Sequence, residues 1–155
     1  MITYLKGDAT EPVTRPAIIA HICNDIGLFG AGFAKALAIK YPKVKQTYLD
    51  YYYKDELRHG KVIYAIPNIN DTSLIVAHMV AQRGVISKDN PKPLMLDALK
   101  AALTALAYHS EVLPHSIHMP RIGCGLAGGV WEEVEPLITE AFKNNKNKIY
   151  VYDLS

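Results

Sequence analysis

The chain of 155 residues has few cysteines, no long apolar run and no large excess of either charge. Its two cysteines, Cys23 and Cys124, are too few for a disulfide framework or a four-ligand structural zinc site. No apolar run approaches the roughly 20 residues of a membrane-spanning helix, and the first residues lack the basic and apolar segments of a secretory signal. We therefore expect a cytoplasmic protein with no membrane partner.

The charge and the histidines exclude further classes of partner. Lysine and arginine number 17 against 15 acidic residues, a formal net charge of +2 with neutral histidines. This balance is too even to indicate nucleic-acid binding. Six histidines are dispersed without ligand spacing, so we expect no metal, and nothing in the sequence indicates a cofactor. Half the residues are hydrophobic, which is typical of one globular domain over residues 1–155; the oligomeric state stays open.

Apolar runs alternate with segments of helical spacing along the chain. We predict strands over residues 2–5, 17–22, 61–66, 74–80, 116–119 and 149–152, and helices over 33–40, 44–54, 94–108 and 131–142. Several strands are apolar along their whole length, which is typical of strands buried on both faces. The pattern predicts a three-layer α/β/α domain with a mixed, mostly parallel sheet. Ligands of such sheets bind at the carboxyl ends of the strands.

Two glycine-rich loops each follow a predicted strand and precede a predicted helix. The first runs from Asn24 to Gly32, and the second has four glycines within residues 123–129. Glycine permits a positive φ and a close approach of the backbone to a ligand, and a helix N-terminus offers free N–H groups to an anion. Neither a GxGxxG nor a GK[ST] motif is present in the first loop. One such loop could be a plain turn, but two at one sheet edge predict a diphosphate clamp.

Four short segments resemble one known family. They are Gly7-Asp8-Ala9, Ala20-His21-Ile22-Cys23-Asn24, Gly30-Ala31-Gly32 and Pro120-Arg121-Ile122-Gly123-Cys124-Gly125. They are similar to the macrodomain, an α/β/α module that binds ADP-ribose, and the resemblance runs from residue 2 to residue 154. The last segment resembles the branch that includes the terminal ADP-ribose–protein glycohydrolases. A related branch processes ADP-ribose 1''-phosphate.

The resemblance implies a set of ligand-binding residues. Asp8 would accept a hydrogen bond from the adenine amino group, and Ala9 would offer backbone contacts. Asn24 would hold the distal ribose, and Tyr152 would pack near the adenine with an aromatic face. Main-chain donors around the diphosphate would come from Gly30, Ala31, Gly32, Phe33, Ile122, Gly123, Cys124, Gly125 and Leu126. The expected partner is ADP-ribose or an ADP-ribosylated protein.

Several of these side chains also have a purely structural interpretation. Asp8 and Asn24 are residue types common in turns and helix caps, and Tyr152 could lie in the core. Arg121 is either a phosphate ligand or the partner of a carboxylate. His21, inside an apolar strand, is more typical of a core histidine. The two cysteines are typical of small packing residues, because no base is identified beside them.

The sequence departs from the glycohydrolase branch at its catalytic couple. That branch uses a lysine nucleophile and an aspartate partner, and the matching positions here hold Gln82 and Ala127. A glutamine cannot form an imine, and an alanine has no carboxylate. A hydrolysis by water would draw on Asn24, Asp25, Gln82 and Arg83. In that scheme Asp25 is the base, Gln82 orients the water and Arg83 stabilises charge on the departing acid.

Three functions from different classes remain. The first is a hydrolase that removes ADP-ribose from acidic side chains, or processes ADP-ribose 1''-phosphate or O-acyl derivatives. The second is a reader that binds ADP-ribose without catalysis, and the third is an unrelated nucleotide-dependent α/β enzyme. The missing lysine–aspartate couple favours the reader, whereas the polar pairs Asn24-Asp25 and Gln82-Arg83 favour a hydrolase. We expect the hydrolase.

Overall fold

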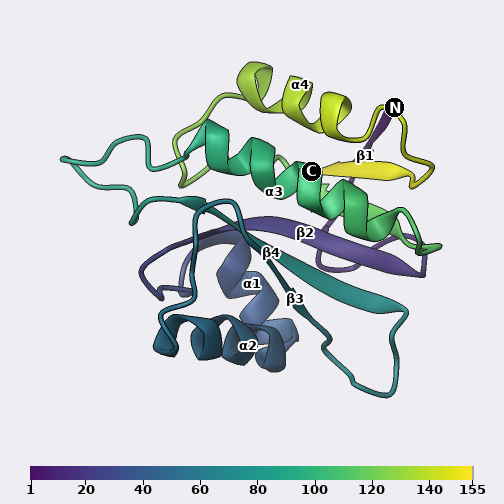
Figure 1. Ribbon diagram of the computed structural model, residues 1–155, viewed down its shortest axis with the longest axis horizontal. Helices are drawn as coiled ribbons and strands as arrows, with labels where there is room; N and C mark the ends of the chain where they lie inside the picture. Colours follow the sequence, from purple (N-terminus) through teal and green to yellow (C-terminus); the bar gives the residue numbers. More distant parts are fainter. Residues whose placement is uncertain (155) are drawn as a thin grey trace.

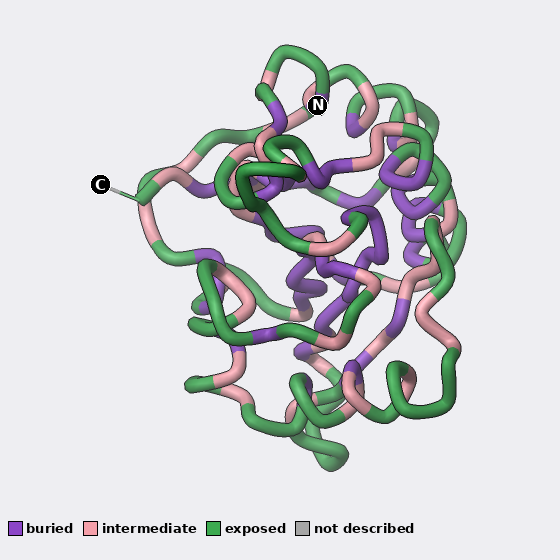
Figure 2. The backbone as a smooth tube through the Cα atoms, turned by 90° about the vertical axis from the view of Figure 1, so that its left-hand side faces the viewer, coloured by how far each residue is buried: buried purple, intermediate pink, exposed green. Residues whose placement is uncertain are grey.

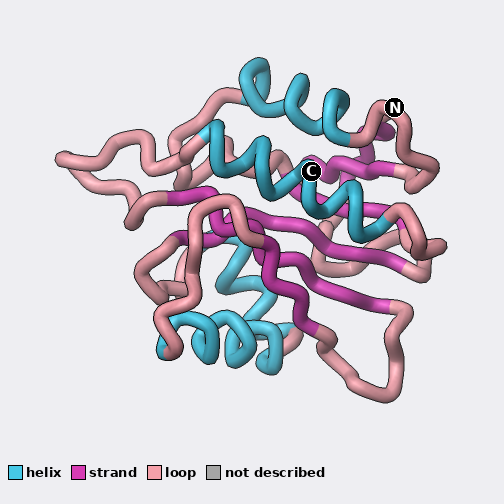
Figure 3. The backbone as a smooth tube through the Cα atoms, viewed as in Figure 1, coloured by secondary structure: helices cyan, strands magenta, loops and turns pink. Residues whose placement is uncertain are grey.

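A computed structural model describes residues 1–154, and every predicted strand and helix is present in it (Figure 3). The ends differ from the predicted ones by at most two residues. The elements are β1 (Ile2–Lys6), β2 (Ala17–Asn24), α1 (Gly32–Lys40), α2 (Pro42–Tyr53), β3 (Val62–Ala65), β4 (Leu74–Gln82), α3 (Leu96–Ser110), β5 (Ser116–Pro120), α4 (Trp131–Ala141) and β6 (Ile149–Asp153).

The strands form one six-stranded sheet in the order β1-β6-β5-β2-β4-β3. Every neighbouring pair is parallel except β3 and β4, which form an antiparallel hairpin. Helices α1 and α2 cover one face of the sheet, and α3 and α4 cover the other (Figure 1). The predicted three-layer α/β/α architecture with a mixed, mostly parallel sheet is therefore confirmed.

Two apolar cores hold the layers together, one on each face of the sheet. Leu99, Leu103 and Met119 belong to the core under α3 and α4, and Leu37 and Tyr48 to the core under α1 and α2. All five are 0% exposed, and complete burial of a large apolar side chain stabilises a fold by about 1.5–3 kcal/mol. Buried residues gather in the middle of the molecule and the loops around it are exposed (Figure 2). Within the described residues, no helix is long and apolar enough to cross a membrane.

The parallel strands end at one common edge of the sheet. The segments that follow β1, β5, β2 and β4 all leave the sheet there, because β1, β6, β5, β2 and β4 run in the same direction. Neighbouring strands lie about 4.8 Å apart, so the four spacings from β1 to β4 span about 19 Å. The fold thus places the predicted site residues in a row along this carboxyl edge.

Candidate functional site at the carboxyl edge of the sheet

The first glycine loop ends in a helix N-terminus with free amides. Helix α1 begins at Gly32, and its N-cap residue Ala31 is extended and makes no side-chain hydrogen bond to the helix. The N–H groups of Gly32, Phe33 and Ala34 have no acceptor within residues 1–154, and the first turn of the helix carries no acidic residue. Unpaired amides at the positive end of a helix dipole attract an anion.

The second glycine loop faces the first. It turns at Gly123 and Gly128, whose φ angles are 76° and 74°. The N–H groups of Gly125 and Leu126 have no acceptor in the described part of the chain. Leu126 Cδ1 lies 3.1 Å from the point where a Cβ on Gly32 would stand. The two loops therefore meet across a short gap with free amides on both sides, as a diphosphate clamp requires.

The loop glycines serve two different purposes. A Cβ added to Gly30 or Gly125 would meet no atom within 4 Å, and neither residue has a positive φ. The positive φ expected of loop glycines occurs at Gly27, Gly32, Gly123 and Gly128 instead. At Gly128 an added Cβ would stand 2.5 Å from the carbonyl oxygen of Pro91. Gly128 is thus required by the fold, whereas Gly30 and Gly125 leave space for a ligand.

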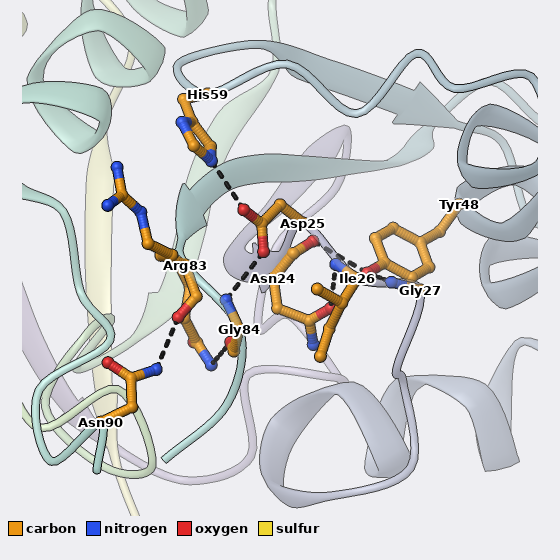
Figure 4. A network of polar contacts seen from close by, with 10 residues as sticks. Asn24, Asp25, Ile26, Gly27, Tyr48, His59, Arg83, Gly84 and Asn90 are labelled. Atoms are coloured by element: carbon orange, nitrogen blue, oxygen red, sulfur yellow. Dashed lines mark hydrogen bonds and ion pairs between the residues drawn. The ribbon is translucent and has the colours of Figure 1, made fainter. Parts of the chain in front are cut away.

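Asn24 has a larger structural role than the sequence indicates. Its Oδ1 accepts hydrogen bonds from Ile26 N (3.0 Å), Leu28 N (3.2 Å) and Tyr48 Oη (2.7 Å), and its Nδ2 donates to Leu28 O (2.6 Å). The residue is 7% exposed and folds the loop over residues 24–28 (Figure 4). A contact of Asn24 with the distal ribose stays a prediction, and only its second Nδ2 hydrogen is left to make it.

Asp25 joins two other segments of the chain. Its Oδ1 accepts a hydrogen bond from Gly84 N at 2.7 Å, and its Oδ2 lies 2.7 Å from His59 Nε2. Partial burial raises the pKa of Asp25, but the hydrogen bonds from Gly84 and His59 outweigh burial and hold the pKa below its usual value. A carboxylate with a lowered pKa and both oxygens occupied is a weak proton acceptor. The geometry therefore argues against Asp25 as the base and favours an orienting role.

Gln82 and Arg83 lie beside this pair. Gln82 stands opposite Asn24 in the register of β4 and β2, and its Nε2 donates to Gly84 O at 3.0 Å. Its Oε1 accepts no hydrogen bond from any residue between 1 and 154. Arg83 is exposed, and its guanidinium has no carboxylate partner among those residues. The structure therefore brings together the four residues predicted to be catalytic.

The two positions of the missing couple also lie near each other. Gln82 forms a β-bridge with Leu94, and Leu94 N donates to the carbonyl oxygen of Ala127 at 3.0 Å. Gln82 and Ala127 are thus both hydrogen-bonding neighbours of Leu94. This proximity supports the alignment that places Gln82 at the lysine position and Ala127 at the aspartate position, although neither side chain can do the chemistry of that couple.

Asp8 and Ala9 mark the other end of the edge, after β1. Asp8 Oδ1 accepts hydrogen bonds from Thr10 N (2.9 Å) and Thr10 Oγ1 (2.8 Å), which is the turn that the residue type favours. The residue is exposed, and Oδ2 has no donor within the described chain. Asp8 can therefore hold its own turn with one oxygen and accept from a ligand with the other. Ala9, the next residue, is buried.

Two further residues at this end, Tyr152 and Arg121, form hydrogen bonds with other residues of the protein. Tyr152 is 3% exposed, and its hydroxyl lies 2.7 Å from His118 Nδ1 and accepts from Val13 N at 3.0 Å. Its covered ring leaves no open face for the expected stacking on adenine. Arg121 donates from Nε to Asp153 Oδ1 (2.5 Å) and from Nη2 to Oδ2 (3.0 Å). Of the two interpretations of Arg121, the structure shows the carboxylate pair.

The buried histidines and cysteines are structural. His21 Nε2 lies 2.5 Å from His78 Nδ1, and His78 Nε2 donates to Val44 O at 2.9 Å. Burial lowers the pKa of both rings, that of His78 to about 4, so both are neutral at physiological pH. Burial also raises the pKa of the Cys23 and Cys124 thiols, which disfavours the nucleophilic thiolate. No group of three or more His, Cys, Asp or Glu side chains converges as metal ligands among residues 1–154.

His59 is the site residue that sequence reasoning missed. It lies in the turn before β3, and the antiparallel register that pairs Val62 with Met79 sets His59 opposite Gln82 when it is continued outward. The start of β3 therefore stands at the carboxyl edge, although its own carboxyl end lies at the far side. The sequence indicates a hairpin-type connection over residues 68–72, but the register of that hairpin is what places His59 at the edge.

Two hollows of the surface lie elsewhere. One runs along the outer face of α3, beside Lys100, Tyr108 and His109, and the other lies between α3 and α4. Neither is lined by any residue of the predicted site. We place the site at the carboxyl edge because the unpaired amides and the clustered polar side chains occur there, whereas the hollows are lined by residues of α3, the end of α4 and the turn after it.

Residues 20–138 match the family model of the Macro domain. The match spans well over half of the chain, and the three-layer fold and the carboxyl-edge loops agree with it. The chain belongs to the macrodomain family.

Individual relatives cover nearly the whole chain. It is 27% identical over 164 residues to ADP-ribose 1''-phosphate phosphatase of Saccharomyces cerevisiae (strain YJM789), across 90% of this chain and 92% of that protein. It is 28% identical over 157 residues to human ADP-ribose glycohydrolase OARD1, across 99% and 91%. Among solved structures, a macrodomain protein of Streptomyces coelicolor superposes with a TM-score of 0.83 at 34% identity over 100% of both chains.

Proposed function

We propose that this protein binds ADP-ribose along the carboxyl edge of its sheet and hydrolyses ADP-ribosyl linkages with water. The substrates are mono-ADP-ribose on acidic side chains, or ADP-ribose 1''-phosphate and O-acyl derivatives. The order of groups along the edge carries this proposal. Asp8 follows β1, the two amide loops follow β5 and β2 in the middle, and Gln82 and Arg83 lie at the end of β4. Adenine, diphosphate and distal ribose have the same order in ADP-ribose.

The length of the carboxyl edge favours ADP-ribose over smaller nucleotides as the ligand. The four strand spacings from β1 to β4 span about 19 Å, which suits a ligand with two ribose units joined by a diphosphate. A ligand that contacts Asp8 through adenine can reach both amide loops only if it carries the full diphosphate. AMP would leave the α1 end of the site empty, so the geometry favours ADP-ribose over AMP.

The distal end of the site supplies groups for the attack of water. Gln82 Oε1 is free to accept a hydrogen bond from the attacking water, which positions it. The unpaired guanidinium of Arg83 can stabilise negative charge on the departing acid. Because Gln82 cannot form an imine, no covalent adduct arises. The relatives named as a phosphatase and a glycohydrolase for ADP-ribose compounds support hydrolysis.

A reader without catalysis is the second candidate. One observation favours it, because Gln82 and Ala127 replace the nucleophile and its carboxylate partner. A reader would bind ADP-ribose through the same amide loops and release no product above the uncatalysed rate.

The test compares binding with turnover. Calorimetry should show micromolar affinity for ADP-ribose, on the order of −8 kcal/mol, and much weaker binding of AMP. Turnover is then measured on serine-linked, glutamate-linked and 1''-phosphate substrates, and product from at least one is expected. Gln82→Ala should slow turnover, while Gln46→Ala, a change on the exposed face of α2, should not. Equal affinity for AMP and ADP-ribose would contradict the two-loop clamp.

A further inference from the structure

Three segments of the chain meet at the carboxylate of Asp25. It lies in the loop after β2, accepts a hydrogen bond from Gly84 N in the loop after β4, and contacts His59 Nε2 in the turn before β3. Both distances are 2.7 Å. Figure 4 shows the imidazole of His59 held above the carboxylate, beside the residues at the end of β4. Asp25 therefore fixes the imidazole relative to Gln82 and Arg83.

The contact also fixes which nitrogen of His59 carries the hydrogen. Asp25 is ionised and can only accept hydrogen bonds, so the hydrogen of the neutral imidazole is on Nε2. Nδ1 then carries a lone pair, and it has no hydrogen-bond partner within residues 1–154. The side chain is 38% exposed. An imidazole with one nitrogen fixed on a carboxylate and the other open is arranged to accept a proton.

We infer that His59 is the general base of the proposed hydrolysis, with Asp25 as its positioning residue. The inference rests on the proposed function. His59 Nδ1 takes one proton from water, and the water oxygen forms a bond to the anomeric carbon of the distal ribose. The bond from that carbon to the ester oxygen breaks, and its electron pair leaves with the carboxylate. The products are ADP-ribose, the free carboxylate side chain and a proton that His59 passes to solvent.

The charges around His59 suit this role. From other elements, Asp25 contacts the imidazole, and Arg83 follows the last residue of β4 next to Gly84, whose N–H binds Asp25 (Figure 4). Its own turn carries Arg58, Glu56 and Lys61, and the last two are paired at 3.9 Å. Among the charged groups of the described chain, Asp25 alone is bonded to the imidazole. After proton transfer the imidazolium is therefore stabilised by Asp25, and Arg83 remains free for the leaving carboxylate.

Kinetics of His59→Gln test the inference on whichever linkage the native protein cleaves. A general base contributes about 10²–10⁴-fold to a rate, so kcat should fall by at least about 100-fold while the Kd for ADP-ribose changes less than about twofold. The acid limb of the native profile of kcat against pH should vanish in the variant. Asp25→Asn should lower kcat as well. Added imidazole should partly restore turnover to His59→Ala.

His109→Gln is the matched control. His109 is an exposed histidine with one hydrogen-bond partner, Tyr64, far from the site, and its loss should leave kcat unchanged. Native turnover that His59→Gln leaves intact would overturn the inference while the proposed function stands. A native protein that binds ADP-ribose but cleaves none of the three linkages would overturn both the hydrolysis and the role of His59, with binding unaffected.

Discussion

Substitution of Gly30 or Gly125 by valine tests whether these glycines are needed for ligand binding or for the fold. Neither glycine has a positive φ, and an added Cβ meets no atom within 4 Å at either position. The fold should therefore tolerate both substitutions, with a change in the free energy of unfolding of at most about 0.5 kcal/mol, as for ordinary surface positions. The branched side chain would instead occupy the gap between the two amide loops.

The loss of binding can be estimated from the contacts it prevents. Hydrogen bonds to a charged group are worth about 1.5–3 kcal/mol each. A valine that holds the diphosphate away from one loop removes at least two of them, or about 3 kcal/mol. Micromolar affinity for ADP-ribose should thus weaken by more than about 100-fold.

Calorimetry with ADP-ribose measures the affinity of each variant, and urea unfolding of the same samples measures the free energy of unfolding. Gly128→Val is the contrasting variant, because its φ is 74° and its Cβ would stand 2.5 Å from Pro91 O. It should lose stability as well as binding. If Gly30→Val and Gly125→Val unfolded like Gly128→Val, or bound ADP-ribose with native affinity, the assignment of the gap to the diphosphate would be refuted.

Three further predictions concern single groups. Asp8→Ala should weaken ADP-ribose binding by about 1–3 kcal/mol in calorimetry, and Asp8→Asn, which can keep the turn, should also weaken it. Asn24→Ala should lower the free energy of unfolding by about 1–3 kcal/mol, because Tyr48 Oη and the amides of the loop lose their acceptor; unchanged urea midpoints would contradict this. Stability should also fall as the pH drops from 6.5 towards about 4. The folded pKa values of His21 and His78 lie below 6.5, so the unfolded chain binds more protons than the folded chain in this range. Each histidine should therefore lower the free energy of unfolding by up to about 1.4 kcal/mol for every pH unit of acidification. Urea titrations across this range should show a shallower slope for His78→Gln.

The fold was accessible from the sequence because its signals are local. Strands such as β2 are mostly apolar, and the spacing of Leu99, Leu103 and Leu106 on α3 indicates a helix on its own. The order of the strands in the sheet was not predicted, since it depends on which apolar faces match across long separations. The glycine loops were predictable for the same local reason, because each follows a strand directly.

Side-chain roles at the site depend on distant partners, and the sequence conveyed them less well. Asn24 was expected to face a ribose, but Tyr48 of α2 takes part of its hydrogen-bonding capacity. Tyr152 was expected either near the adenine or in the core, and it is 3% exposed with its hydroxyl bound to His118 and Val13. His59 stands 34 positions from Asp25 in the chain, and only the hairpin register brings the two together. A local pattern predicts which residues reach the edge and leaves open what each of them contacts there.

The release of ADP-ribose from a glutamate-linked ADP-ribosyl peptide, followed in the presence of borohydride, tests the central claim most directly. Borohydride traps the imine that a lysine nucleophile would form, whereas a hydrolysis by water passes through no such intermediate. We predict free ADP-ribose and unmodified protein by mass spectrometry. A protein that gains the mass of a reduced ADP-ribose adduct, or one that binds ADP-ribose and releases product from none of the three linkages, would contradict the account.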